Sequence, residues 1–246
     1  MTVRGYIANA TYTRGLVSRP PSVRVHFMPN LTPIVYVVDD DLSVRESLEL
    51  LIRHAGWQPV LLASAQEFLS RSHAEVPSCL VLDVSLPGIS GLDLQEQLAG
   101  QTTMPIIFIT GYGDVPMSVR AMKAGAVEFL VKPFNDEALF SAIRGALEHS
   151  RAALHHDAAM RGLRDDYASL TPREREVMTL VTSGLLNKQI GQTLGISEIT
   201  VKAHRGQVMR KMNADSLPDL VTMATRLGLR PVKDAPGRLP SDTTYS

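Results

Sequence analysis

From residue 34 to residue 150, short apolar runs alternate with longer segments in which apolar residues recur every three or four positions. The short runs suit buried strands, and the longer segments have the period of amphipathic helices. This alternation is typical of a parallel sheet that is covered by helices on both faces. The predicted strands are IVYVV at 34–38, PVLLA at 59–63, CLVLDV at 79–84, PIIFIT at 105–110 and EFLV at 128–131.

Cap signals mark the beginnings of the helices between these strands. Ser43 and Glu46 have the spacing of a capping box, and we predict that Ser43 caps the first helix. Ser64 and Glu67 repeat the spacing, and Asn135 is the predicted cap of the last helix. The result is five strand and helix units over about 115 residues, which is a usual domain size.

The remaining chain has only helical patterns. Thr171 is predicted to cap a helix that has Pro172 at its first position and Glu174 closing a capping box. A short helix ends at Gly195, and Ser197 is predicted to cap the longer helix that follows. Two helices joined by such a tight turn, within a group of four, are typical of a helix-turn-helix domain.

These patterns divide the chain into five segments, at 1–32, 33–150, 151–166, 167–230 and 231–246. The second is the sheet domain and the fourth the helical domain, and we expect a partly helical linker between them. The first segment is interpreted as a disordered extension, or as the result of a mis-assigned start, because Met28 stands just before the first strand signal. The Pro-rich, polar tail is expected to be disordered.

The net charge of zero conceals three differently charged segments. Residues 1–33 carry four bases and no acid, residues 34–150 carry seven bases and fifteen acids, and residues 151–246 carry fourteen bases and ten acids. The acidic part could hold a cation and the basic part could meet nucleic acid, although either could be a solvated surface. Because no segment has the pattern of a membrane span or a signal peptide, we expect a cytoplasmic protein without membrane association.

Polar residues stand where four of the predicted strands end. In open parallel sheets, ligands bind beyond the carboxyl ends of the strands. Each of these residues alone has an ordinary explanation as a cap, a strand end or a turn residue. Their common location instead indicates a site made of Asp39, Asp40, Asp83, Thr110 and Lys132.

The chemistry of such a site is that of phosphoryl transfer. Clustered carboxylates repel one another, and a hard divalent cation among them removes that cost. Mg²⁺ fits best, because its octahedral shell uses few protein oxygens and leaves places for water and phosphate oxygens. With Lys132 neutralising the phosphoryl oxygens, Asp83 can attack phosphorus and form an acyl phosphate, to which Thr110 could donate a hydrogen bond.

Four segments of the chain carry recognisable motifs: VVDDD, LVLDVSLPGISGLDL, IIFITGYGDVPMSVRAMKAGAVEFLVKPF and LTPREREVMTLVTSGLLNKQIGQTLGISEITVKAHRGQVMRKM. With these segments the chain resembles the two-component response regulators of the NarL/FixJ family, and FixJ-type members most of all. The resemblance implies an α/β fold. It predicts a CheY-like receiver with a five-stranded parallel sheet of order 2-1-3-4-5, followed by an all-α, LuxR-type helix-turn-helix domain of four helices.

The same resemblance implies roles for the acidic residues. Asp83 would be the phosphoacceptor, and Asp39 and Asp40 would form the acidic pair. The Mg²⁺ shell would include Asp40, Asp83 and the backbone carbonyl of Ser85, with Asp39 acting through water.

A switch is implied as well, in which Thr110 is the switch hydroxyl and Phe129 the switch aromatic. Thr110 would move toward phosphorylated Asp83, and Phe129 would turn inward into the vacated space. Lys132 would precede a cis proline, Pro133. We expect the phosphorylated receiver to form a homodimer through the segment MSVRAMKAGAVEFL.

The basic end contains the predicted DNA-binding helix. Without the preceding turn, a solvated basic helix would be the better interpretation. With it, the residues expected to face the major groove are Lys202, Ala203, His204, Arg205 and Gly206. Lys188 and Thr200 could hold phosphates. Gly206 stands where family members often carry a longer side chain, so few direct base contacts or a reading of DNA shape are expected.

We therefore predict a transcription regulator rather than a turnover enzyme, with a receiver that catalyses phosphoryl transfer to its own Asp83. Its partners would be a sensor histidine kinase, double-stranded DNA and RNA polymerase, and we expect activation. One alternative is a phosphatase with an aspartate nucleophile, but such enzymes keep a general acid two residues later, where this chain has Ser85. Another is a DNA-binding regulator that a ligand or a partner controls without phosphorylation.

Overall fold

The structure is a computed structural model that describes residues 32–229. The predictions for a disordered extension, an alternative start at Met28 and a disordered tail lie outside the described residues. The described chain divides into two compact units, the first ending at Arg164 and the second beginning at Asp165. Among residues 32–229, no helix is both long and apolar enough to cross a membrane.

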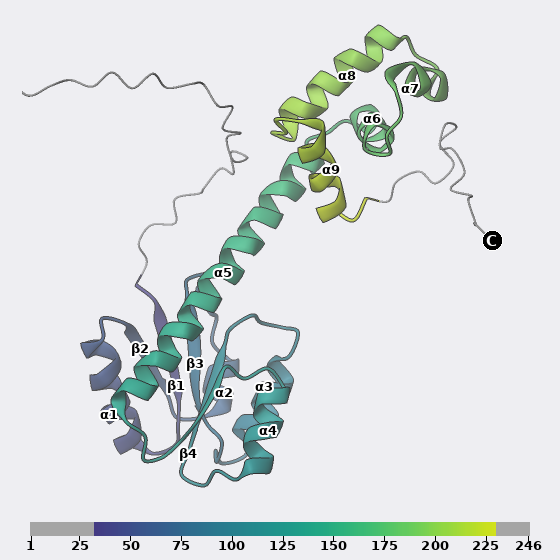
Figure 1. Ribbon diagram of the computed structural model, residues 1–246. Helices are drawn as coiled ribbons and strands as arrows, with labels where there is room; N and C mark the ends of the chain where they lie inside the picture. The colour runs from purple at the N-terminus through teal and green to yellow at the C-terminus, as the bar shows by residue number, and fades with distance from the viewer. Residues whose placement is uncertain (1–31, 230–246) are drawn as a thin grey trace, which may run out of the picture. The chain divides into compact units, whose positions relative to one another are not determined.

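Five strands and five helices alternate along the first unit (Figure 1). All neighbouring strands are parallel, and their order is β2-β1-β3-β4-β5, which confirms the predicted sheet. The elements are β1 Ile34–Val38, α1 Leu42–His54, β2 Gln58–Leu62, α2 Ala65–Leu69, β3 Ser78–Asp83, α3 Gly91–Leu98, β4 Ile106–Thr110, α4 Val115–Lys123, β5 Glu128–Val131 and α5 Asp136–Ala168.

The sheet has an apolar core on each face because side chains alternate along every strand. In β3, Cys79 and Val81 pack in the cluster with residues of α1 and α5. Leu80 and Leu82 point the other way, into the cluster with residues of α2, α3 and α4. Cys79 is fully buried, and burial raises the pKa of its thiol to about 12, which suits a core residue and not a nucleophile.

The strand register brings the carboxyl ends of the central strands to one edge. Val38 of β1 lies beside Leu82 of β3, and Asp83 lies beside Ile109 of β4. Thr110, the last residue of β4, lies beside Val131, the last residue of β5. Residues that follow β1 and β5 are therefore brought to the same edge as Asp83.

The cap of α1 differs from the prediction. Asp41 is the N-cap, and its carboxylate accepts hydrogen bonds from the backbone N–H of Ser43 at 2.8 Å and from its hydroxyl at 2.6 Å. Since Asp41 already satisfies these donors, Ser43 lies inside the first turn and caps nothing. Ser64 caps α2 as predicted, and its hydroxyl accepts from the N–H of Glu67.

The segment predicted as the last receiver helix and a partly helical linker forms one helix, α5, of 33 residues. Its second half is rich in Ala, Arg and Leu, which favour the helical state. His155 and His156 are exposed on it. No proline interrupts the helix at residues 151–166, so the chain continues helically through the expected linker.

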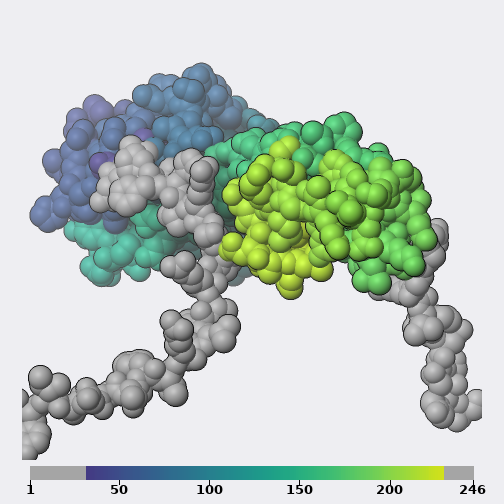
Figure 2. All heavy atoms as spheres, turned by 90° about the horizontal axis from the view of Figure 1, so that it is seen from above, coloured from purple at the N-terminus to yellow at the C-terminus, as the bar shows by residue number. Residues whose placement is uncertain are grey.

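Four helices form the second unit after α5, and Figure 2 shows their surface in green to yellow. They are α6 Pro172–Thr182, α7 Asn187–Leu194, α8 Glu198–Lys211 and α9 Leu217–Arg226. The turn between α7 and α8 passes close to Gly191, where a Cβ would lie only 2.7 Å from the carbonyl oxygen of Ile196. Gly195 ends α7 with φ +66°, and Ser197 caps α8 as predicted. Val201 and Val208 of α8 and Met212, which follows it, are buried in the core of this unit.

A nearly buried ion pair joins the start of α6 to the end of α8. The Glu174 carboxylate, whose side chain is 7% exposed, lies 2.7 Å from the ammonium of Lys211. It also accepts a hydrogen bond from the N–H of Thr171 at 2.8 Å and so closes the predicted capping box. The hydrogen bond from Lys211 is the main cause that lowers the pKa of Glu174.

We expect Glu174→Gln to destabilise this unit by about 1–3 kcal/mol at pH 7, because the ion pair is lost while an acceptor for Thr171 is kept. The lowered pKa means that the carboxylate stabilises the fold above its usual pKa of 4.5 and that this contribution disappears as the pH falls through the folded-state pKa. Hydrogen exchange of the α6 and α8 amides at several pH values measures the difference. Glu176→Gln, which breaks an exposed ion pair with Arg173, is the control and should cost much less; equal losses would contradict the assignment.

Candidate functional site

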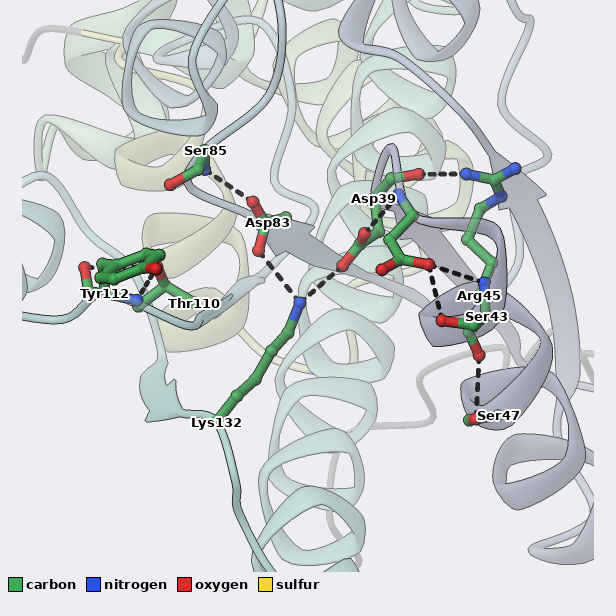
Figure 3. Close-up of polar contacts among 10 residues, drawn as sticks. Asp39, Ser43, Arg45, Ser47, Asp83, Ser85, Thr110, Tyr112 and Lys132 are labelled. Atoms are coloured by element: carbon green, nitrogen blue, oxygen red, sulfur yellow. Dashed lines mark hydrogen bonds and ion pairs between the residues drawn. The ribbon is translucent and has the colours of Figure 1, made fainter.

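Lys132 lies between two carboxylates at the predicted edge of the sheet (Figure 3). Its ammonium is 2.8 Å from Oδ2 of Asp39, which follows β1, and 3.2 Å from Oδ1 of Asp83, which ends β3. The two acidic side chains are 2% and 6% exposed, and that of Lys132 is 25% exposed. The structure therefore brings together three of the residues that the sequence placed at one site.

Backbone groups hold the other oxygens of both carboxylates. The N–H of Ser85 donates to Oδ2 of Asp83 at 2.7 Å, and the N–H of Asp41 donates to Oδ1 of Asp39 at 2.9 Å. Arg45 of α1 donates to the carbonyl oxygen of Asp39 at 2.6 Å. Sequence reasoning missed Arg45, and the only signal was a basic residue in the first turns of a helix that follows the acidic run.

The site has two carboxylates for one ammonium, and this imbalance sets its electrostatics. Burial raises the pKa of Asp83, and attraction by Lys132 only partly offsets the effect. Burial acts to lower the pKa of Lys132, but hydrogen bonds and attraction from Asp39 and Asp83 outweigh it, so that this pKa is raised. Lys132 is thus cationic at neutral pH, and the site can gain from a further positive charge.

Two carboxylates, those of Asp39 and Asp83, are the close oxygen donors for a magnesium ion at this site. Asp40 is exposed, and within residues 32–229 no three acidic, histidine or cysteine side chains are grouped as metal ligands. Asp39 and Asp83 form a close pair around Lys132, and the Asp40 side chain is exposed directly after Asp39 in the chain. Mg²⁺ commonly takes one or two protein carboxylates and completes its shell with water and phosphate oxygens, so the pair fits this ion.

Thr110 is fully buried, and the loop that follows it holds its hydroxyl (Figure 3). The hydroxyl accepts from the N–H of Tyr112 at 3.2 Å and donates to the carbonyl oxygen of the same residue at 3.4 Å. Phe129 is half-buried, with its ring centroid 6.2 Å from that of Phe108. The peptide bond between Lys132 and Pro133 is cis, as the resemblance implied.

The β4–α4 loop also packs closely on these residues at Gly113. A Cβ added there would lie 2.7 Å from Cγ2 of Val131, 3.1 Å from the Phe129 ring and 3.3 Å from Cγ2 of Thr110. No pattern in the sequence predicts this contact, because it depends on the path of the loop over β5.

The predicted DNA-binding residues differ in exposure. Lys202, Ala203 and Gly206 are exposed on α8, as are Lys188 on α7 and Thr200 in the first turn of α8. His204 and Arg205 are half-buried, and the Arg205 guanidinium donates to Oδ1 of Asn187 at 3.0 Å. Arg205 therefore links α8 to α7 in the structure, while Lys202 lies 3.5 Å from the exposed Glu198.

Comparison with known proteins supports both units. Family models of the response regulator receiver domain and of the luxR family of bacterial regulatory proteins match residues 35–144 and 168–224. Nodulation protein W of Bradyrhizobium diazoefficiens is 50% identical over 205 residues, which are 83% of this chain and 90% of that protein. The transcriptional regulatory protein FixJ of Azorhizobium caulinodans is 44% identical over 209 residues, which are 85% of this chain and 99% of that protein. The solved structure of the response regulator StyR is similar with a TM-score of 0.72 and 47% identity, covering 80% of this chain and all of that one.

Replacing Lys132 with methionine should leave two buried carboxylates without their cation and destabilise the first unit by roughly 2–4 kcal/mol at pH 7 without Mg²⁺. The loss should shrink as the pH falls, because Asp83 already has a raised pKa and protonation removes the repulsion. Urea unfolding followed by the fluorescence of Trp57, the only tryptophan, measures this unit.

Added Mg²⁺ should restore part of the stability of this variant, since the ion replaces the missing charge. Lys123→Met, at an exposed position of α4, is the matched control and should change little. Wild-type stability of Lys132→Met at pH 7 without Mg²⁺ would refute the electrostatic account.

Proposed function

This chain belongs to the two-component response regulators that join a receiver domain to a LuxR-type DNA-binding domain, and on that premise we propose that phosphorylation of Asp83 controls how it binds DNA. It is a transcription regulator, and proteins of this kind interact with histidine kinases and with DNA. The observation that carries the proposal is the Lys132 ammonium held between buried Asp39 and Asp83.

The proposed chemistry is transfer of a phosphoryl group from a sensor histidine kinase to Asp83. A carboxylate oxygen of Asp83 bonds to phosphorus as the bond from phosphorus to the histidine nitrogen of the kinase breaks. Lys132 neutralises charge on the phosphoryl oxygens and keeps the carboxylate oriented. The receiver thus assists one transfer to itself and is not a turnover enzyme.

Receiver domains generally bind Mg²⁺ at the phosphorylation site, and we assign the ion here to Asp39, Asp40, Asp83 and the Ser85 carbonyl. The excess negative charge of the Asp39 and Asp83 pair supports this assignment. When bound, the ion neutralises phosphoryl charge. Ser85 and Asp40 are both exposed beside the pair, where oxygen ligands are accessible.

Thr110 and Phe129 are the proposed switch. The buried Thr110 hydroxyl would exchange its contacts with the Tyr112 backbone for the phosphoryl oxygens, and Phe129 would move into the space that opens. Both residues are adjacent to the surface of α4 and β5, through which we propose that the phosphorylated receiver forms a homodimer. Exposed apolar side chains on this surface support the proposal, namely Val115, Val119, Met122 and Val131.

The second unit would place α8 in the major groove of double-stranded DNA, with one copy on each of two half-sites. Lys202, Ala203 and Gly206 face outward on α8, and Lys188 and Thr200 are exposed where phosphates can be reached. His204 and Arg205 belong to the proposed interface at its edge. Activation through contact with RNA polymerase completes the proposal.

Two other functions have less support. A phosphatase of this type needs a general acid two residues after the nucleophile, and Ser85, which stands there, offers only a hydroxyl and its backbone groups. A regulator controlled by a ligand or a partner without phosphorylation would not need Lys132 between two buried carboxylates.

Incubation of the full-length protein with a small phosphodonor and Mg²⁺ should add one phosphoryl group, measured by intact mass. Asp83→Asn should abolish the gain, because the amide is not a nucleophile toward phosphorus. Asp93→Asn, at an exposed carboxylate at the start of α3, should leave it intact. No gain in the wild type would count against the proposed function.

Lys202→Ala should weaken DNA binding and reduce the slope of log affinity against log salt by about one unit if the side chain contacts a phosphate. Fluorescence anisotropy over a range of salt concentrations measures the slope. Lys202→Arg keeps the charge and should keep the slope. If affinity and slope are unchanged in Lys202→Ala, the proposal that this face of α8 contacts DNA is wrong.

A further inference from the structure

Four residues form one exposed row along α8: Ile199, Lys202, Ala203 and Gly206. Their spacing of i, i+3, i+4 and i+7 places them on the same face of the helix. Val201 and Val208 are buried on another face, in the core of the unit. The row is therefore the part of α8 that can enter a groove without disturbing the fold.

Ile199 is the most exposed large apolar residue of the second unit among residues 165–229, at 80%. A single exposed apolar side chain needs no explanation by itself. Here, however, it is the second residue of the helix, where a β-branched side chain adds nothing to helix propensity and the core does not use it. Because Ile199 belongs to the exposed row, its side chain lies on the face of α8 that is free to contact a partner.

The rest of the row has little capacity for hydrogen bonds. Only Lys202 carries a polar group, Ala203 offers one methyl group and Gly206 has no side chain. Arg205, which could read a base, donates instead to Asn187 on α7. A row of this composition can recognise a base mainly by apolar contact.

Only thymine presents an apolar group in the major groove, the C5 methyl, and apolar side chains recognise it by packing. In helix-turn-helix proteins, residues near the N-terminal end of the second helix contact base edges. Ile199 is at that end, two residues after the Ser197 cap, and the close approach at Gly191 fixes α7 against the turn that leads to it.

We propose that Ile199 packs against the C5 methyl group of a thymine in each half-site and so selects an A·T pair at that position. The proposal rests on the proposed DNA-binding function and adds a residue that determines specificity. Lys202 then supplies attraction to the DNA, while Ile199 supplies discrimination between bases.

The test begins with duplexes selected from a random pool by the full-length protein treated with a small phosphodonor and Mg²⁺. In one selected half-site, each thymine is replaced singly by uracil, which removes only the C5 methyl group. At one position the wild type should lose roughly three- to fivefold in affinity, the factor that burying one methyl group contributes. Ile199→Ala should bind the thymine and uracil duplexes equally at that position.

Leu186→Ala is the matched control, because Leu186 is 70% exposed in the same unit but lies outside the row. This variant should keep the wild-type sensitivity to uracil. The melting temperature of Ile199→Ala should equal that of the wild type, because the Ile199 side chain is exposed and contributes little to the core.

The proposal is overturned if no thymine methyl affects wild-type binding, or if Ile199→Ala keeps the same sensitivity to uracil. In either case the protein still binds DNA, and Ile199 is left as a surface for a protein partner or a second copy. If the wild type binds no duplex from the pool, the proposed function fails together with this inference.

Discussion

The fold of the first unit converges on one interaction, the Lys132 ammonium between the carboxylates of Asp39 and Asp83. The three residues are far apart in sequence, and only the parallel register of β1, β3, β4 and β5 brings them to one edge. Two buried carboxylates around one cation leave an excess of negative charge, which costs stability and makes the site receptive to a cation and a phosphoryl group. The same strand ends bring Thr110 to this edge, and Phe129 lies in the neighbouring strand β5. In the proposed switch, these two residues would pass a change in charge at Asp83 to the surface of α4 and β5.

The second unit contains an ion pair of the opposite kind. Glu174 and Lys211 are matched one to one, and Oε2 of Glu174, which Lys211 contacts, also accepts a hydrogen bond from the N–H of Thr171 in the capping box. Such a balanced pair joins α6 to α8 and leaves no excess charge at the contact. With α8 fixed, its exposed row can act as a rigid reading surface. The two ion pairs thus differ in their charge balance, since the receiver site has an excess carboxylate and the contact between α6 and α8 has none.

The sequence predicted most of the fold because its patterns are local. The strands at 34–38 and 128–131 begin and end where predicted, and the Thr171 capping box is present as expected. The prediction that Ser43 caps α1 was wrong. Two side chains there can accept the hydrogen bond, and Asp41, two residues before Ser43, is the one that does. The sheet order came from the family resemblance, since apolar periodicity carries no information on strand order.

What the sequence could not supply depends on contacts between distant elements. The pairing of Lys132 with both carboxylates, the hydrogen bond from Arg45 to the Asp39 carbonyl and the close packing at Gly113 arise only once the sheet is assembled. The exposure of Ile199 could not be predicted from the sequence either. The sequence shows only an apolar residue, and the structure shows that this residue lies outside the core. The engagement of Arg205 with Asn187 likewise needs both helices in place.

The most direct test of the account is the affinity of the full-length protein for duplex DNA before and after treatment with a phosphodonor and Mg²⁺, in the wild type and in Asp83→Asn. The account predicts that treatment increases the affinity of the wild type and leaves that of the variant unchanged. Equal affinities in all four measurements would contradict the claim that chemistry at Asp83 controls the DNA-binding unit.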